Sequence, residues 1–81
     1  MENLFGSLTD MNEFIELYRI SKLTNLKITL DFEPHFTKFE YKISKEGKPI
    51  KIIMFSGNTS AKERIDTLVA SLRRDGYEFY Y

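Results

Sequence analysis

The chain has 81 residues, which is enough for one domain and too few for two, so a single domain over residues 1–81 is expected. Twelve basic residues balance twelve acidic ones, so no net positive field attracts nucleic acid and no net charge keeps copies apart. The absence of cysteine excludes disulfides and thiolate chemistry and favours a cytoplasmic location. Glu2 stands where a secretory leader would be basic, and no apolar run reaches the roughly 18 residues of a membrane span, so neither is expected.

The first predicted element is a helix over about residues 7–23. Its apolar side chains recur at helical spacing and are expected to face the core: Met11, Phe14, Ile15 and Tyr18. The charged side chains off this stripe are expected in solvent: Glu13, Glu16, Arg19 and Lys22. Ser7, Thr9 or Asp10 could provide the N-cap oxygen, and Asp10 followed by Glu13 resembles a capping box.

From Leu26 onward the apolar period changes to two, which predicts three strands. The inward positions of the first two strands are Leu26, Ile28, Leu30, Phe32, Phe39, Tyr41 and Ile43. A tight turn at Glu46 and Gly47 would place Ile43 opposite Ile50 and Tyr41 opposite Ile52. Under that register the third strand directs Ile50, Ile52 and Met54 to the core, and Lys51, Ile53 and Phe55 outward.

A second helix follows Ser60, which forms a capping box with Glu63. Its apolar stripe is Ile65, Leu68, Val69 and Leu72, and Gly76 marks its end. Alternating aromatic residues in 77–81 predict a short fourth strand along a sheet edge. The predicted fold is therefore α+β in the order α-β-β-β-α-(β): a three-stranded antiparallel meander, two helices on one face and a short C-terminal strand.

The residue pattern gives no indication of catalysis. His35 is the single histidine and lies at a turn, and no nucleophile elbow, metal-binding helix or phosphate-binding loop is present in the sequence. The possible carboxylate pairs, Glu13 with Glu16 and Glu63 with Asp66, are expected on solvated helix surfaces. We therefore expect no enzyme activity, cofactor, metal or small-molecule substrate.

The predicted outward side of the third strand is the candidate binding surface. There Ile53 and Phe55 would form an apolar centre, with Lys51 at its border. The residues expected to join them are Phe36, Tyr80 and Tyr81. An apolar centre with a charged border is typical of protein interfaces, so the sequence predicts a non-enzymatic interaction module that binds another protein or a second copy of itself.

The α-β-β-β-α order and four residues resemble the double-stranded RNA-binding domain. That family has a Glu in its first helix, a Pro-His pair at the first strand turn and an aromatic residue four positions after the His; the matching residues are Glu13, Pro34, His35 and Phe39. The resemblance implies an alternative function in duplex RNA binding through Lys45, Lys48, Lys62 and Arg64. The family's lysine cluster at the second helix is reduced here to Lys62 and Arg64 beside Glu63, so nucleic acid is the less favoured partner.

In size and element order, the chain is also similar to small inhibitor proteins of phages and mobile elements, including anti-CRISPR inhibitors. This resemblance implies the non-enzymatic blocking of a host protein. It includes no diagnostic motif.

Overall fold

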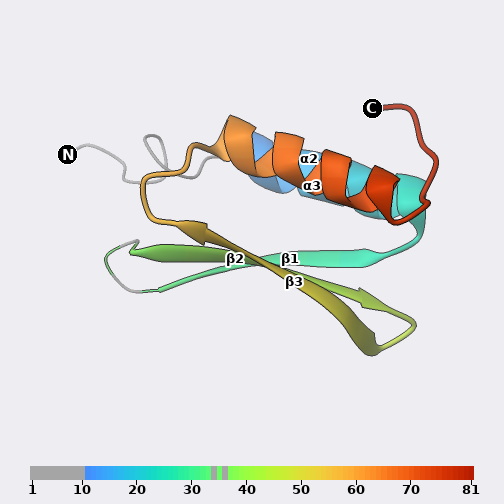
Figure 1. Cartoon of the computed structure of the whole chain (residues 1–81), viewed down its shortest axis with the longest axis horizontal. Helices are drawn as coiled ribbons and strands as arrows, with labels where there is room; N and C mark the ends of the chain where they lie inside the picture. The colour runs from blue at the N-terminus through green and yellow to red at the C-terminus, as the bar shows by residue number, and fades with distance from the viewer. Residues whose placement is uncertain (1–10, 34, 36) are drawn as a thin grey trace.

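The computed structural model describes residues 11–33, 35 and 37–81. Its elements are α2 (Met11–Thr24), β1 (Lys27–Phe32), β2 (Lys38–Lys45), β3 (Lys48–Ser56) and α3 (Ala61–Arg74). This α-β-β-β-α order confirms the predicted α+β class (Figure 1). The proposed N-cap residues Ser7, Thr9 and Asp10 and the predicted contact residue Phe36 lie outside the described residues.

The three strands form one antiparallel sheet in the order β1-β2-β3, and both helices lie over the same face of it (Figure 1). Between β1 and β2 the register is the predicted one, with Leu30 opposite Tyr41 and Phe32 opposite Phe39. Apolar residues alternate toward the helices along β2, where Phe39, Tyr41 and Ile43 are all buried. We call the other side of the sheet, which neither helix covers, its open face.

The predicted register between β2 and β3 is wrong beyond the hairpin. The two-residue turn forms as expected, with positive φ at Glu46 and Gly47, and it aligns Lys45 with Lys48. The register then shifts by one residue between Ile43 and Ser44. Proline cannot donate to a strand ladder, and Pro49 lies at this shift, where a bulge tolerates the missing donor.

The shift exchanges the set of β3 side chains that faces the helices with the set that faces away from them. Tyr41 now lies opposite Ile53, and Phe39 opposite Phe55, so Ile53 and Phe55 pack toward the helices. The Tyr41 and Phe55 rings meet edge to face with centroids 5.1 Å apart. The prediction that Lys51, Ile53 and Phe55 face outward is therefore wrong: all three are partly buried on the helix-covered side. The residues predicted for the core are exposed instead: Ile50 47%, Ile52 55% and Met54 57%.

The predicted buried face of α2 is also wrong. Its core positions are Glu13, Leu17 and Ile20. The predicted stripe is exposed: Met11 74%, Phe14 39%, Ile15 52% and Tyr18 64%. The helix is rotated from the expected orientation because Glu13 is neutralised by a buried arginine of α3, which allows a carboxylate to occupy the core-facing side.

Helix α3 agrees with the sequence prediction. The Glu63 N–H donates to Ser60 Oγ at 3.2 Å and the Ser60 N–H donates to Glu63 Oε1 at 3.0 Å, which completes the capping box. The predicted stripe is buried along its whole length. At the C-terminal end Gly76 has φ +102 and donates to the Arg73 carbonyl, while the Tyr77 N–H donates to the Leu72 carbonyl. This pair of bonds is the Schellman motif, which reverses the chain after the helix.

The tail formed by residues 77–81 is not a strand, so the predicted fourth strand is wrong. Buried and exposed side chains nevertheless alternate along the tail: Tyr77 and Phe79 pack against the core, and Tyr80 is 96% exposed. The tail returns along the helix layer, and the Tyr81 hydroxyl donates to Glu16 of α2. Its residues pack on the helices because the reversal after Gly76 directs the chain there and away from the sheet (Figure 1).

Candidate functional site

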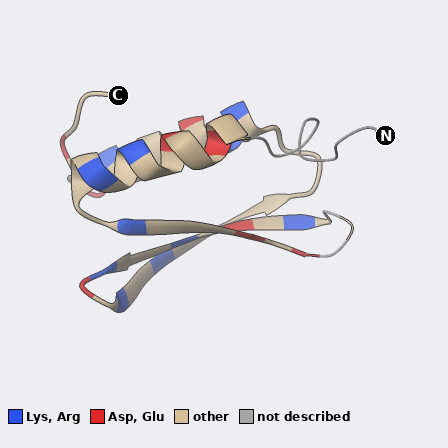
Figure 2. Cartoon of the chain, turned by 180° about the vertical axis from the view of Figure 1, so that it is seen from behind, with Lys and Arg blue, Asp and Glu red and all other residues tan. Residues whose placement is uncertain are grey.

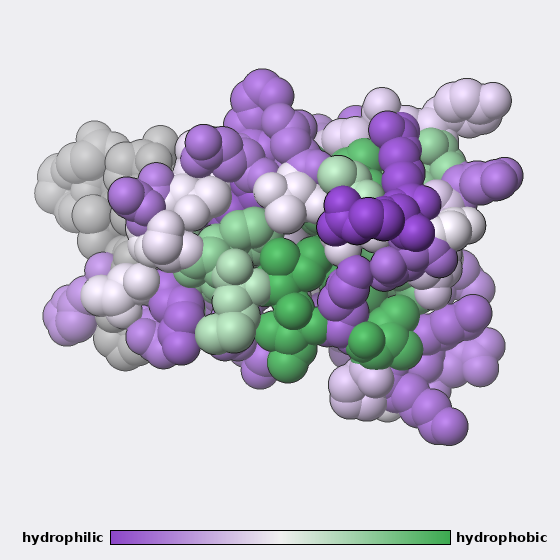
Figure 3. Space-filling view, in the orientation of Figure 1, coloured by the Kyte–Doolittle hydropathy of each residue, from purple (hydrophilic) through white to green (hydrophobic). Residues whose placement is uncertain are grey.

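The most prominent candidate surface is an apolar row on the open face of β3, formed by Ile50, Ile52 and Met54. We call it the β3 stripe. Its three side chains alternate along one strand and are each about half exposed. Figure 3 shows hydrophobic side chains gathered over β3 and in the band between β3 and α3. The sequence prediction also placed the candidate surface on this strand, but with the opposite set of its side chains facing outward.

Polar groups border the stripe on the neighbouring strand. Glu40 lies opposite Met54 and Lys42 opposite Ile52. The Lys42 ammonium pairs with Asp31 of β1 at 2.7 Å, and its pKa is raised by this hydrogen bond and the charge of the carboxylate. Lys42 and Asp31 thus satisfy each other across β1 and β2, and the large exposed apolar side chains of the open face are concentrated on β3.

The stripe also lies on an edge of the sheet. Among the described residues β3 pairs with β2 alone, so its other side presents backbone N–H and C=O groups without a strand partner. An exposed apolar edge strand is a template for pairing with another chain. The nine-residue length of β3 makes this edge longer than the six-residue β1 at the opposite side.

Lys51 has a structural contact in place of the predicted binding role. Its Nζ donates to Ser71 Oγ and to Asp75 Oδ2, both at 2.7 Å. These bonds connect β3 to the C-terminal half of α3. Because the ammonium is directed toward the helix, no basic side chain interrupts the stripe on the open face.

The structure does not bring Tyr80 and Tyr81, the aromatic residues predicted to join this surface, onto β3. Tyr81 lies on α2, where its ring is 5.3 Å from the Arg19 guanidinium and its hydroxyl donates to Glu16. Burial and then the Glu16 hydrogen bond raise the pKa of Tyr81, which keeps its hydroxyl a donor. Tyr80 is exposed on the tail, beside the helices.

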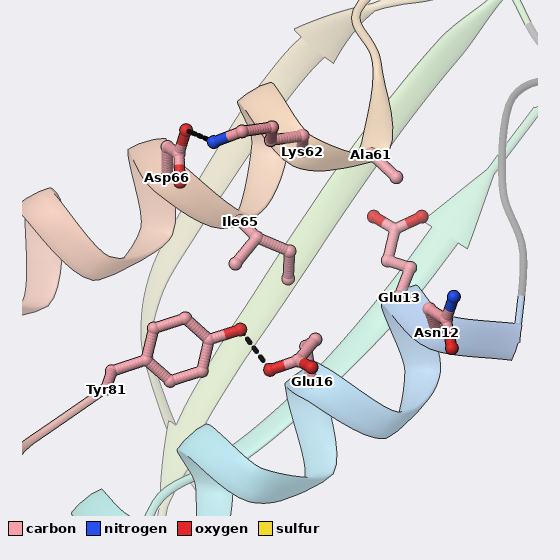
Figure 4. A pocket seen from close by; sticks show the side chains of 8 residues that line it. All are labelled: Asn12, Glu13, Glu16, Ala61, Lys62, Ile65, Asp66 and Tyr81. Atoms are coloured by element: carbon pink, nitrogen blue, oxygen red, sulfur yellow. Dashed lines mark hydrogen bonds and ion pairs between the residues drawn. The ribbon is translucent and has the colours of Figure 1, made fainter.

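Tyr81 borders a pocket of about 370 Å³ between the N-terminal halves of α2 and α3 (Figure 4). Its side chains are joined in pairs: Tyr81 bonds to Glu16, and the Lys62 ammonium lies 2.9 Å from Asp66. Among the described residues no group of three or more His, Cys, Asp or Glu could hold a metal ion. The pocket therefore has no polar arrangement that points to a particular ligand or reaction.

A buried polar network behind this pocket was missed by sequence reasoning. Arg64 donates to both carboxylate oxygens of Glu13, from Nε and Nη2, at 2.8 Å each. Tyr41 donates its hydroxyl to the same carboxylate, and Arg64 lies 3.9 Å from the Phe39 ring centroid. The network connects α2, β2 and α3, and Arg64 and Tyr41 are completely buried.

The environment fixes the protonation of this network. Burial would lower the pKa of Arg64, but the hydrogen bonds and charge of Glu13 outweigh it and raise that pKa. Burial, followed by the bond to Glu13, raises the pKa of Tyr41 well above its usual range. A charged guanidinium and a neutral phenol thus both donate to one carboxylate, and the arrangement joins three elements of the core.

The residues predicted for RNA binding do not form one surface. Arg64 is completely buried and therefore cannot contact a phosphate, and Lys62 pairs with Asp66. Lys45 and Lys48 lie at the β2–β3 hairpin, at the opposite end of the molecule from the start of α3 (Figure 1). Figure 2 shows basic and acidic residues interspersed over both layers. His35, from the same resemblance, is exposed.

No helix within the described part of the chain is long and apolar enough to cross a membrane. Comparisons with protein-family models, with curated proteins and with solved structures found no match to this chain.

Proposed function

We propose that this protein is a non-enzymatic interaction module that binds another protein chain through the β3 stripe. The observation that supports this function is that three half-exposed apolar side chains lie on the open face of the sheet and belong to an edge strand. Scattered single apolar residues are common on protein surfaces, whereas a contiguous apolar row with a polar border is typical of interfaces.

The chemistry of the surface favours a protein partner. Apolar side chains, and edge backbone groups that have no strand partner within the described part of the chain, suit a partner that supplies a strand and apolar side chains of its own. A nucleic-acid surface would instead need unpaired cations, and the nearest open-face lysine, Lys42, is paired with Asp31. The similarity in size and element order to small phage and mobile-element inhibitors agrees with a partner of this class.

A substitution with a matched control tests this function. Ile52→Lys places a charge in the centre of the stripe, and Ile15→Lys makes the same change on α2 at nearly equal exposure, 52% against 55%. Tagged wild-type and variant proteins would be incubated with an extract of the source cells, and the recovered proteins quantified by mass spectrometry. Direct titration against each purified candidate partner would follow.

We expect at least one protein that binds the wild type and Ile15→Lys but binds Ile52→Lys at least tenfold more weakly. Circular dichroism should show that all three proteins are folded. If every protein that binds the wild type also binds Ile52→Lys with equal affinity, the stripe is not the binding surface and the proposal is wrong.

A further inference from the structure

We propose that the β3 stripe binds a second copy of this chain, by antiparallel pairing of the two β3 edges about a two-fold axis at Ile52. This inference rests on the proposed function, because it uses the same surface and names its partner. The pairing would join two three-stranded sheets into one six-stranded sheet, with all four helices on one side.

The first argument is that the stripe is complementary to itself. An antiparallel pair centred on Ile52 places Ile52 against its own copy and Ile50 against Met54 twice. Opposite residues in an antiparallel pair point to the same face, so these three contacts bring apolar side chains together on the open face. A two-fold interface requires one patch to fit itself in this way.

The second argument is the placement of charge. The lysines of the strand, Lys48 and Lys51, would lie opposite Ser56 and Ile53 of the second copy, so no like charges meet. Moving the axis by one residue to Lys51 would place Met54 against Lys48 and lose an apolar contact. Moving it to Ile53 would place Ile50 against Ser56 and lose an apolar contact. The order of residues along β3 therefore favours the axis at Ile52.

The third argument is the contrast with the other edge. Along β1 the open-face positions are Lys27, Thr29 and Asp31, which are all exposed and polar. Charged and polar side chains, prolines and bulges are common means of preventing edge pairing. In β3 the proline and the bulge lie at the hairpin end, and Ile52 and Met54 lie in the regular part of the strand, with no charged side chain among the three residues of the stripe. The chain has no net charge to oppose association of two copies.

The mass in solution is the first test. Light scattering after size exclusion, over a series of concentrations, should give twice the mass of one chain for the wild type and for Ile15→Lys. Ile52→Lys places two charges at the axis and should shift the protein to a monomer, with a dissociation constant at least tenfold weaker. A monomeric wild type at all concentrations would overturn the proposal.

Single cysteines test the register, because the natural chain has none. With Ile52→Cys the two thiols would lie on strands whose opposing Cα atoms are about 5 Å apart, within disulfide range. In an Ile50→Cys dimer the two cysteines would be four residues out of register, about 13 Å apart along the strand, which is too far. A mixture of Ile50→Cys and Met54→Cys would restore the contact.

We expect mild oxidation to cross-link Ile52→Cys rapidly, to cross-link the mixture as the mixed pair, and to leave Ile50→Cys alone and Ile15→Cys largely uncross-linked. Equal rates for Ile52→Cys and Ile15→Cys would overturn the proposed pairing. If the wild type is monomeric but Ile52→Lys still loses a partner from the extract, the dimer is wrong and the proposed function is retained. If the wild type is monomeric and Ile52→Lys loses no partner from the extract, both the dimer and the proposed function are wrong.

Discussion

Replacing Arg64 with methionine would remove a cation that bonds to both carboxylate oxygens of Glu13, and it should be the most damaging single change in the core. Glu13 is 2% exposed and Arg64 0%, so the substitution takes the guanidinium away from a buried carboxylate. Breaking a buried ion pair by removing one partner costs about 3–5 kcal/mol. A domain of this size has a free energy of unfolding of about 4–12 kcal/mol, at ~0.05–0.15 kcal/mol per residue. Arg64→Met should therefore lose a large fraction of the free energy of unfolding.

Removing all three polar partners should have a much smaller effect. The triple variant Glu13→Leu, Tyr41→Phe, Arg64→Met replaces the network with apolar side chains and leaves no buried charge and no tyrosine hydroxyl without an acceptor. Such replacements are often neutral or stabilising by about 1–4 kcal/mol. The triple variant should thus be more stable than the single variant, although it carries two further substitutions.

Urea unfolding followed by circular dichroism measures these differences. Lys62→Met is the matched control, because Lys62 also forms an ion pair from α3 but its side chain is 85% exposed; it should change stability by less than about 0.5 kcal/mol. The reasoning is refuted if Arg64→Met lies within about 1 kcal/mol of the wild type, or if the triple variant is less stable than Arg64→Met.

Two further predictions concern the tail and the pH dependence of stability. Deleting residues 77–81 removes Tyr77 and Phe79 from the core and should cost about 2 kcal/mol, because full burial of one such side chain contributes about 1.5–3 kcal/mol and both are half-buried. A thermal melt should then shift downward by about 10 °C, and an unchanged melting temperature would show that the tail does not stabilise the fold. The pKa of Tyr41 is higher in the folded protein than in the unfolded chain. Above pH ~10 the unfolded chain therefore releases a proton that the folded chain keeps. The contribution of Tyr41 to the free energy of unfolding should then fall by about 1.4 kcal/mol per pH unit. Below pH ~9 this contribution is constant. In urea titrations at a series of alkaline pH values, Tyr41→Phe should lose stability less steeply with pH than the wild type, by that amount per pH unit. Equal slopes in the two proteins would contradict the raised pKa of Tyr41.

The elements that the sequence predicted well are those determined by neighbours close along the chain. The capping box at Ser60, the buried stripe of α3 and the reversal at Gly76 all depend on residues within a few positions of one another. The two-residue turn at Glu46 and Gly47 and the β1–β2 register have the same local origin, since turn geometry and alternation fix both.

The candidate site depended on a detail that the local pattern does not contain. Two interleaved apolar sets alternate along β3, so the strand itself is evident but the side that faces the helices is not. A single bulge beside Pro49 selected Ile53 and Phe55 for the core and left Ile52 and Met54 exposed. Proline near the hairpin was the available signal, because it cannot donate to the ladder and marks an irregular position.

Sequence alone thus determined the order and kind of the two helices and the three strands, because hydrophobic period, caps and turns are local properties of the chain. The tertiary structure decided which faces are buried. Glu13 and Arg64 are 51 residues apart, and their contact, with that of the Tyr41 hydroxyl, allows the Glu13 side of α2 to be a core face. The tail likewise alternates as a strand would, yet it packs on the helices because the chain reverses at the end of α3. Burial is a property of the assembled layers, and side chains distant in sequence determine it together.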